Sequence, residues 1–130
     1  MFLRWLPALL MMLLIYFVSA QSSSNLPNFD WADILVKKGG HAVGYAVLAF
    51  LYWRALGFED SQWGLAWLLA ILYAITDEFH QSFVPGRHPA IWDVLIFDNF
   101  GALISLWLVN RYRKQKRPDL FHPIAKDPRG

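Results

Sequence analysis

The sequence predicts an all-α protein, an integral membrane bundle of four transmembrane helices that forms one domain over residues 1–130. Apolar residues make up 56% of the chain and aromatic residues 17%, which is more apolar surface than a soluble domain of 130 residues can cover. Charged residues account for 17%, below the roughly one quarter typical of soluble domains. They also cluster in a few places. We therefore expect a multi-pass protein of the cell membrane.

The first predicted span covers residues 3–20 and is interrupted only by Arg4 and Pro7. Proline is tolerated in a first helical turn, where its missing N–H costs little. At 1.5 Å per residue this span reaches roughly 27 Å, just enough to cross a bilayer. The small-residue ending Val18-Ser19-Ala20 also resembles the end of a cleavable signal peptide. Both readings place the chain from residue 21 onward outside, and the sequence leaves the choice between them open.

The other three spans are predicted over residues 41–56, 63–79 and 91–109. Residues 21–38 are rich in Ser, Asn and Pro and predict an external loop that includes a short interfacial helix over 31–36. The pair Pro85-Gly86 predicts a tight turn between the third and fourth spans. Residues 110–130 predict a basic, loosely ordered cytoplasmic tail, because its three prolines discourage a helix.

The distribution of Lys and Arg predicts that both chain termini are cytoplasmic. Under this orientation nine basic residues lie inside: Arg4, Arg54, Arg111, Arg113, Lys114, Lys116, Arg117, Lys126 and Arg129. Only three lie outside: Lys37, Lys38 and Arg87. The positive-inside rule favours this arrangement. The net charge of +2 comes mostly from the tail directly after an apolar span, so it indicates a cytoplasmic flank and not a nucleic-acid surface.

Charged and polar side chains gather at the outer ends of the second, third and fourth spans and form a candidate site. Its members are Lys38, His41, Tyr45, Asp77, Glu78, His80, Gln81, Arg87, Asp93 and Asp98. A lone carboxylate in a bilayer costs about 2.5–3.5 kcal/mol on insertion scales, so these groups are expected to face the bundle interior and pair. Arg87 is the natural bidentate partner for Asp77 or Asp93, and the sequence does not choose between them.

These residues carry a resemblance to a known family. The runs Lys38-Gly-Gly-His41-x-x-x-Tyr45, Asp77-Glu-Phe-His-Gln-x-Phe-x-Pro-Gly-Arg87 and Asp93-Val resemble the VanZ-like family, over roughly residues 35–106. The resemblance implies a small multi-span membrane protein of a family named after a member associated with teicoplanin resistance. It implies no particular reaction.

The spacing after Asp93 departs from the family pattern. That pattern places an Asp or Asn four residues after the aspartate and a Gly three further on, whereas here Asp98 follows at five and Gly101 at eight. Either a local π-bulge absorbs one residue, or Asp93 and Asp98 do not both occupy their family positions.

Two functions compete for this site. We favour a binding or accessory protein that contacts membrane lipids and holds a lipid-linked or cell-wall-derived ligand at the outer face, over an enzyme that acts there on a lipid phosphate or ester. A transporter is less favoured because four spans make a poor pathway without homo-oligomerisation. Asp77-x-x-His80 has the acid-x-x-His spacing of helical metal sites, but this spacing is common, so neither a metal nor a cofactor is expected. Without cysteine, the chain has no disulfide or thiolate chemistry.

Overall fold

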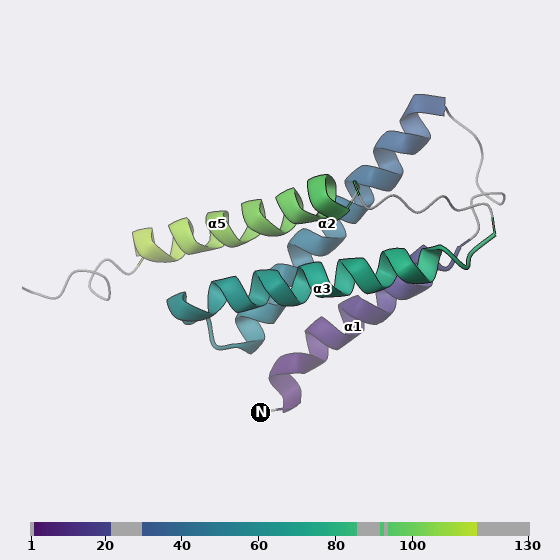
Figure 1. Ribbon diagram of the computed structural model, residues 1–130. Coiled ribbons are helices and arrows are strands. Elements are labelled where there is room, and N and C mark those ends of the chain that lie inside the picture. Colours follow the sequence, from purple (N-terminus) through teal and green to yellow (C-terminus); the bar gives the residue numbers. More distant parts are fainter. Residues whose placement is uncertain (1, 22–29, 86–91, 93, 117–130) are drawn as a thin grey trace, which may run out of the picture.

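The computed structural model describes residues 2–21, 30–85, 92 and 94–116, and within these residues all regular structure is helical. Figure 1 shows how the helices are arranged. The long helices are α1 (Phe2–Ser19), α2 (Asp30–Ala55), α3 (Trp63–Gln81) and α5 (Asn99–Lys116). A 3-10 helix, η2 (Asp60–Gln62), precedes α3, and a π-helix, η3 (Val94–Asp98), leads into α5. The prediction of an all-α fold is confirmed.

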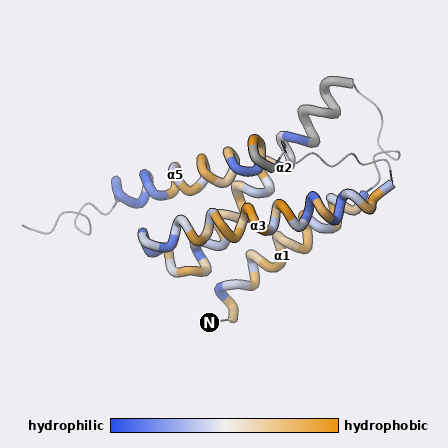
Figure 2. Tube along the Cα trace, in the orientation of Figure 1, coloured by the Kyte–Doolittle hydropathy of each residue, from blue (hydrophilic) through white to orange (hydrophobic). Residues whose placement is uncertain are grey.

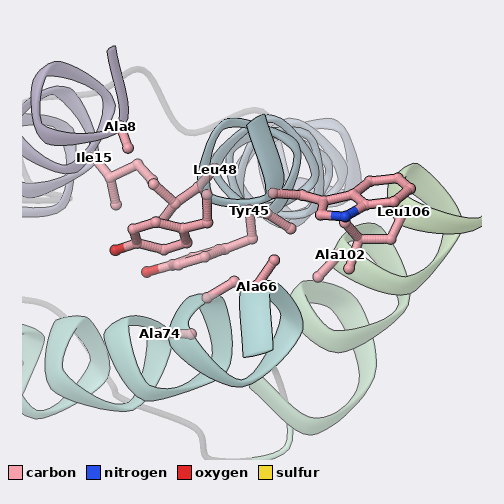
Figure 3. Packing of buried hydrophobic residues seen from close by; sticks show 12 residues of the cluster. Ala8, Ile15, Tyr45, Leu48, Ala66, Ala74, Ala102 and Leu106 are labelled. Atoms are coloured by element: carbon pink, nitrogen blue, oxygen red, sulfur yellow. The ribbon is translucent and has the colours of Figure 1, made fainter. Parts of the chain in front are cut away.

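Helix α2 holds the bundle together, because it packs against α1, α3 and α5 (Figure 1). Its side chains Tyr45, Leu48 and Trp53 are almost completely buried. Figure 3 shows Tyr45 and Leu48 lying between α1, α3 and α5. Large side chains on α2 therefore fill the space that its three neighbours leave.

Helix α3 offers α2 a face of small residues. Ala66, Ala70 and Ala74 recur every fourth position and are buried, so the helix can approach its neighbours closely. The same face continues to Asp77 and Gln81, which are also buried. The helical repeat that buries the alanines thus carries a carboxylate and an amide into the interior.

Helix α5 lies against the backbone of α2 at Gly101. A Cβ atom added to Gly101 would overlap the backbone carbonyl of Ala42, a group that cannot rotate away. Close backbone approach through glycine is a common device of helix pairs in membranes. Gly101 therefore fixes how near the second half of the chain lies to α2, and the η3 residues lie immediately before it.

Two helix boundaries differ from the predictions. Helix α2 begins at Asp30 and passes through Gly39-Gly40, so the short helix predicted over 31–36 is continuous with the second span instead of separated from it by a loop. Glycine weakens a helix interior by only about 1 kcal/mol, which the apolar residues that follow offset. Helix α5 continues through the start of the predicted tail to Lys116, because its last residues are Arg, Lys and Gln, which favour helix and complement the negative end of its dipole.

The end of the bundle at which α2 passes to α3 is closed by aromatic and basic side chains. Gly57 and Phe58 adopt positive φ values of 88° and 59°, which turn the chain sharply after α2. The Trp53 Nε1–H donates to the Glu59 carbonyl at 2.8 Å, and the Phe58 ring packs edge-on against Trp53. The Arg113 guanidinium of α5 lies 5.1 Å from both ring centres. The turn and α5 are thereby tied to α2.

The outer surface of the bundle is largely apolar. Exposed large apolar side chains occur on all four long helices and include Leu10, Phe17, Val43, Val47, Leu68, Leu72, Phe100 and Ile104. Figure 2 shows apolar residues along the middle of α1, α3 and α5, with hydrophilic residues towards the end of α5. By length and composition, only α1 among the described helices qualifies to cross a membrane. The aromatic and acidic residues of α3 and the basic end of α5 lower the mean hydropathy of those helices.

Replacing Gly101 by alanine is expected to destabilise the bundle by about 1–3 kcal/mol, because the added methyl group meets backbone and not a flexible side chain. Unfolding of the purified protein in mixed micelles, by heat or by denaturing detergent, measures the loss. Gly40→Ala is the matched control, since a Cβ there meets nothing within 4 Å and alanine is the better helix former. Equal stability of the two variants would contradict the close contact between α2 and α5.

Candidate functional site

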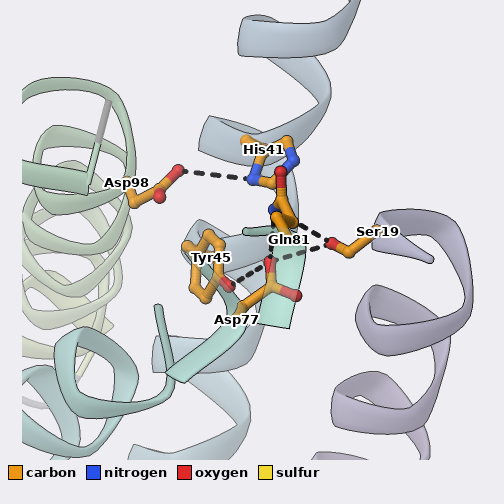
Figure 4. A network of polar contacts seen from close by, with 6 residues as sticks. All are labelled: Ser19, His41, Tyr45, Asp77, Gln81 and Asp98. Carbon is orange, nitrogen blue, oxygen red and sulfur yellow. Dashed lines mark hydrogen bonds and ion pairs between the residues drawn. The ribbon is translucent and has the colours of Figure 1, made fainter. Parts of the chain in front are cut away.

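A buried carboxylate, that of Asp77, is the centre of the candidate site (Figure 4). Its Oδ2 atom accepts hydrogen bonds from the Ser19 hydroxyl at 2.8 Å, the Tyr45 hydroxyl at 3.0 Å and the Gln81 amide at 3.1 Å. The Gln81 amide also lies 3.4 Å from the Ser19 hydroxyl oxygen. All four side chains are buried. We call these four residues the Asp77 cluster.

Three helices supply the Asp77 cluster. Ser19 is the last residue of α1, Tyr45 lies in the middle of α2, and Asp77 and Gln81 are one turn apart near the end of α3. Because α1 and α3 run in the same direction relative to the bundle, their last turns meet at the same end. The cluster consequently joins all three helices at one depth.

The second oxygen of Asp77 is different. Oδ1 is buried and accepts no hydrogen bond from any of the described residues. A buried carboxylate oxygen that lacks a donor leaves a desolvation cost uncompensated, and such atoms in native structures call for a specific explanation. Three protein donors occupy Oδ2, so Oδ1 is the atom of the Asp77 carboxylate that lacks a donor among the described residues.

A second acid lies beside the cluster. Asp98 is buried, with 2% of its surface exposed, and its Oδ1 lies 3.9 Å from Nδ1 of His41 (Figure 4). The His41 ring in turn lies 6.1 Å from the Tyr45 ring. Asp98 is the last residue of the π-helix, the kind of local feature that one of the two sequence alternatives required. Tyr45 and His41 therefore connect two buried carboxylates.

The other predicted site residues lie around this centre or outside it. The Lys38 ammonium group lies 4.9 Å from the centre of the Phe97 ring. The His80 ring packs against the Tyr16 ring of α1, with 4.5 Å between the ring centres. Glu78 is half-buried and, as the next residue after Asp77, points to a different side of the helix. Arg87 and Asp93, and with them the predicted pairing of Arg87, lie outside the described residues.

The geometry does not assemble a metal centre from the part of the chain that the structure describes. No group of three His, Asp or Glu side chains there could hold a metal ion. The chemistry of the described site is hydrogen bonding between a carboxylate, two hydroxyls and an amide, with an imidazole 3.9 Å from a second carboxylate.

Ser19 is the functional candidate that sequence reasoning missed. It stands in the Val-Ser-Ala ending that also resembles a signal-peptide cleavage site, so its hydroxyl carried no sign of a partner in α3. The position of Ser19 along its helix could have indicated the contact. Ser19 ends the first apolar span, and a polar residue there lies level with the polar residues at the end of a parallel helix. Helix α1 also accepts a hydrogen bond from the Tyr73 hydroxyl at the Met12 carbonyl, 2.7 Å away.

The fold and the site together define a class of protein: a small helical bundle with an apolar exterior and a buried polar centre near one end. Comparison with known families makes the class specific. A family model described as VanZ/LLP1 matches residues 4–113, which is most of the chain, and the chain belongs to this family. No curated protein and no solved structure matches it significantly.

Removing one donor of the Asp77 cluster is expected to destabilise the bundle. Ser19→Ala and Tyr45→Phe each delete a hydroxyl that donates to Oδ2, at a cost of about 1 kcal/mol in a membrane protein. Unfolding of the purified variants by denaturing detergent measures the loss.

The matched control is Ser82→Ala, which removes an exposed hydroxyl that donates only to the Phe79 carbonyl of its own helix. Coupling between sites is measured by combining Ser19→Ala with Asp77→Asn. Purely additive losses in this double-mutant cycle would show that Ser19 and Asp77 do not interact.

Proposed function

We propose that this VanZ-family chain is a multi-pass protein of the cell membrane, in which α1, α2, α3 and α5 are the four spans and both termini are cytoplasmic. The exposed apolar side chains of all four helices support this, because their exposure to the hydrocarbon core of a bilayer has no free-energy cost. The buried polar side chains support it too, since ionisable groups in membranes face the bundle interior. The asymmetry of Lys and Arg supports the orientation.

The topology is testable with single cysteines, because the chain contains none. Gln21→Cys, at the exposed end of α1, is expected to react with a membrane-impermeant maleimide in intact cells. Gln115→Cys, exposed near the end of α5, is expected to react only after the membrane is permeabilised. An N-terminal epitope tag that stays with the labelled protein shows that α1 is retained and not cleaved. The reverse labelling pattern would contradict the proposed orientation.

We further propose that the Asp77 cluster, together with His41 and Asp98, is a binding site at the outer membrane face for a lipid-linked or cell-wall-derived ligand. The observation that carries this proposal is Oδ1 of Asp77, a buried acceptor without a donor among the described residues. An ionised carboxylate accepts hydrogen bonds and donates none, so its ligand must present O–H or N–H groups. Sugar hydroxyls and peptide amines of cell-wall precursors and glycopeptides have this chemistry.

The charge of the site favours binding over the competing enzyme. Two buried carboxylates, Asp77 and Asp98, repel a phosphate anion in direct contact. One contact favours the enzyme: Tyr45 donates to Asp77 at 3.0 Å, the reach that acid–base chemistry requires. In that alternative, Asp77 and Tyr45 form the acid–base pair: water attacks a lipid ester or phosphate, its proton passes to Asp77, and the bond to the leaving oxygen breaks as that oxygen takes up the proton. The two functions share residues and differ in whether lipid chemistry changes.

Asp77→Asn is expected to abolish the contribution of the protein to teicoplanin resistance in a host whose resistance depends on it. The amide replaces a strong acceptor by a neutral group and places a donor among three donors. The measurement is the teicoplanin susceptibility of cells that express each variant at equal membrane abundance. Glu59→Gln, a change of the same chemistry at an exposed residue in the turn before α3, is the control.

Envelope-lipid composition, measured in the same cells, separates the two functions. Under the binding proposal, Asp77→Asn removes resistance and leaves the lipids unchanged. A change in lipid composition that accompanies the loss would replace the binding proposal with the enzyme. Resistance equal to that of the unaltered protein would contradict a role for the Asp77 cluster in either function.

A further inference from the structure

The opposite end of the bundle carries two adjoining hollows. The first, between the start of α3 and the second half of α5, has a volume of about 400 Å³ and an almost wholly apolar lining that includes Trp63, Phe100, Leu103, Ile104, Trp107 and Asn110. The second, of about 430 Å³, continues along α5 and is lined by Trp107, Asn110, Arg111, Lys114 and Gln115. We call them the apolar groove and the basic hollow. They share Trp107 and Asn110.

The apolar groove has the length of one leaflet. Phe100 and Asn110 are separated by ten residues of regular helix, which amounts to about 15 Å. This is half of the ~30 Å hydrocarbon core of a bilayer. Trp63 and Trp107 are half-exposed at its rim, where indole rings are typical of the level of lipid headgroups. The groove is thus matched to an acyl chain that ends in a headgroup at the basic hollow.

The chemistry of the basic hollow indicates which headgroup. Arg111 and Lys114 place two positive charges at its edge, and the Arg111 guanidinium is positioned over the Trp107 ring at 5.5 Å. Figure 2 shows the change along α5 from an apolar to a hydrophilic stretch. Between the two hollows lies Oδ1 of Asn110, buried and without a hydrogen-bond donor among the described residues. The ligand must therefore combine a negative charge with a hydroxyl donor.

We propose that the apolar groove and the basic hollow form a binding site for phosphatidylglycerol in the leaflet where α1 begins and α5 ends. An acyl chain lies along Phe100, Ile104 and Trp107, the phosphate lies between Arg111 and Lys114, and a glycerol hydroxyl donates to Asn110. The inference rests on the proposed membrane embedding and is independent of the Asp77 cluster, which lies at the other end of the bundle. Two basic residues at a headgroup make the site selective for anionic over zwitterionic lipid.

Native mass spectrometry of the full-length protein in detergent, with equal amounts of phosphatidylglycerol and phosphatidylcholine, tests the site. The unaltered protein is expected to retain phosphatidylglycerol preferentially. Arg111→Gln with Lys114→Gln is expected to weaken that binding about tenfold or more. Lys116→Gln with Arg117→Gln removes the same net charge further along the chain and is expected to change it by less than about twofold. Equal losses in the two double variants, or equal retention of the two lipids, would overturn the proposal.

A second comparison isolates the hydroxyl contact. Phosphatidylmethanol carries the same phosphate charge without a glycerol hydroxyl. Asn110→Leu is expected to weaken the binding of phosphatidylglycerol and to leave the binding of phosphatidylmethanol unchanged. If the binding of both lipids weakens equally, Asn110 does not contact the glycerol hydroxyl of the headgroup. Asp77→Asn must leave lipid retention unchanged, so a failure here and a failure of the Asp77 cluster are distinguishable.

Discussion

The structure depends on how a carboxylate is kept inside an apolar bundle. Burial of Asp77 removes water from its carboxylate, and a buried polar group left without a partner costs about 1–3 kcal/mol, or more when charged. Donors from α1, α2 and α3 converge on its Oδ2 and replace the lost water. Because each donor comes with its helix, the carboxylate also fixes how the ends of these helices meet. The small alanine face of α3 is what lets the partners come within hydrogen-bonding distance.

The same arrangement leaves one oxygen of the Asp77 carboxylate without a hydrogen-bond donor among the described residues. Three donors crowd one oxygen of Asp77, while Oδ1 accepts nothing from the described residues. A purely structural cluster would gain by distributing its donors over both oxygens, since each unpaired buried acceptor costs about 1–3 kcal/mol. Buried groups that are held in position and incompletely paired are typical of places where a ligand supplies the missing partner.

Much of this could be predicted from the sequence, and the parts that could not have a common cause. Depth along each helix follows from the order of residues, so Tyr45, Asp77 and Gln81 were expected at one end of the bundle. Contacts between helices follow from packing angles, which single-helix periodicity does not encode. For this reason Ser19, whose hydroxyl donates to Asp77 from a different helix, was missed. The run of α2 through Gly39-Gly40 was missed because glycine weakens a helix interior by only about 1 kcal/mol, too little to end a helix of this length.

The two ends of the bundle differ in the charge of their polar side chains. Acids and their donors occupy the interior where α1 and α3 end, and basic side chains occupy the surface where α5 ends. The difference in placement follows from side-chain chemistry. A carboxylate is compact and must be enclosed by donors, whereas Lys and Arg reach out on long apolar stems that cover neighbouring rings, as Arg113 covers Trp53. Gly101 links the two ends, because the close approach of α5 to α2 positions Asp98 before it and Trp107 after it. One backbone contact therefore sets the depth of the interior site and the course of the groove on the outer surface.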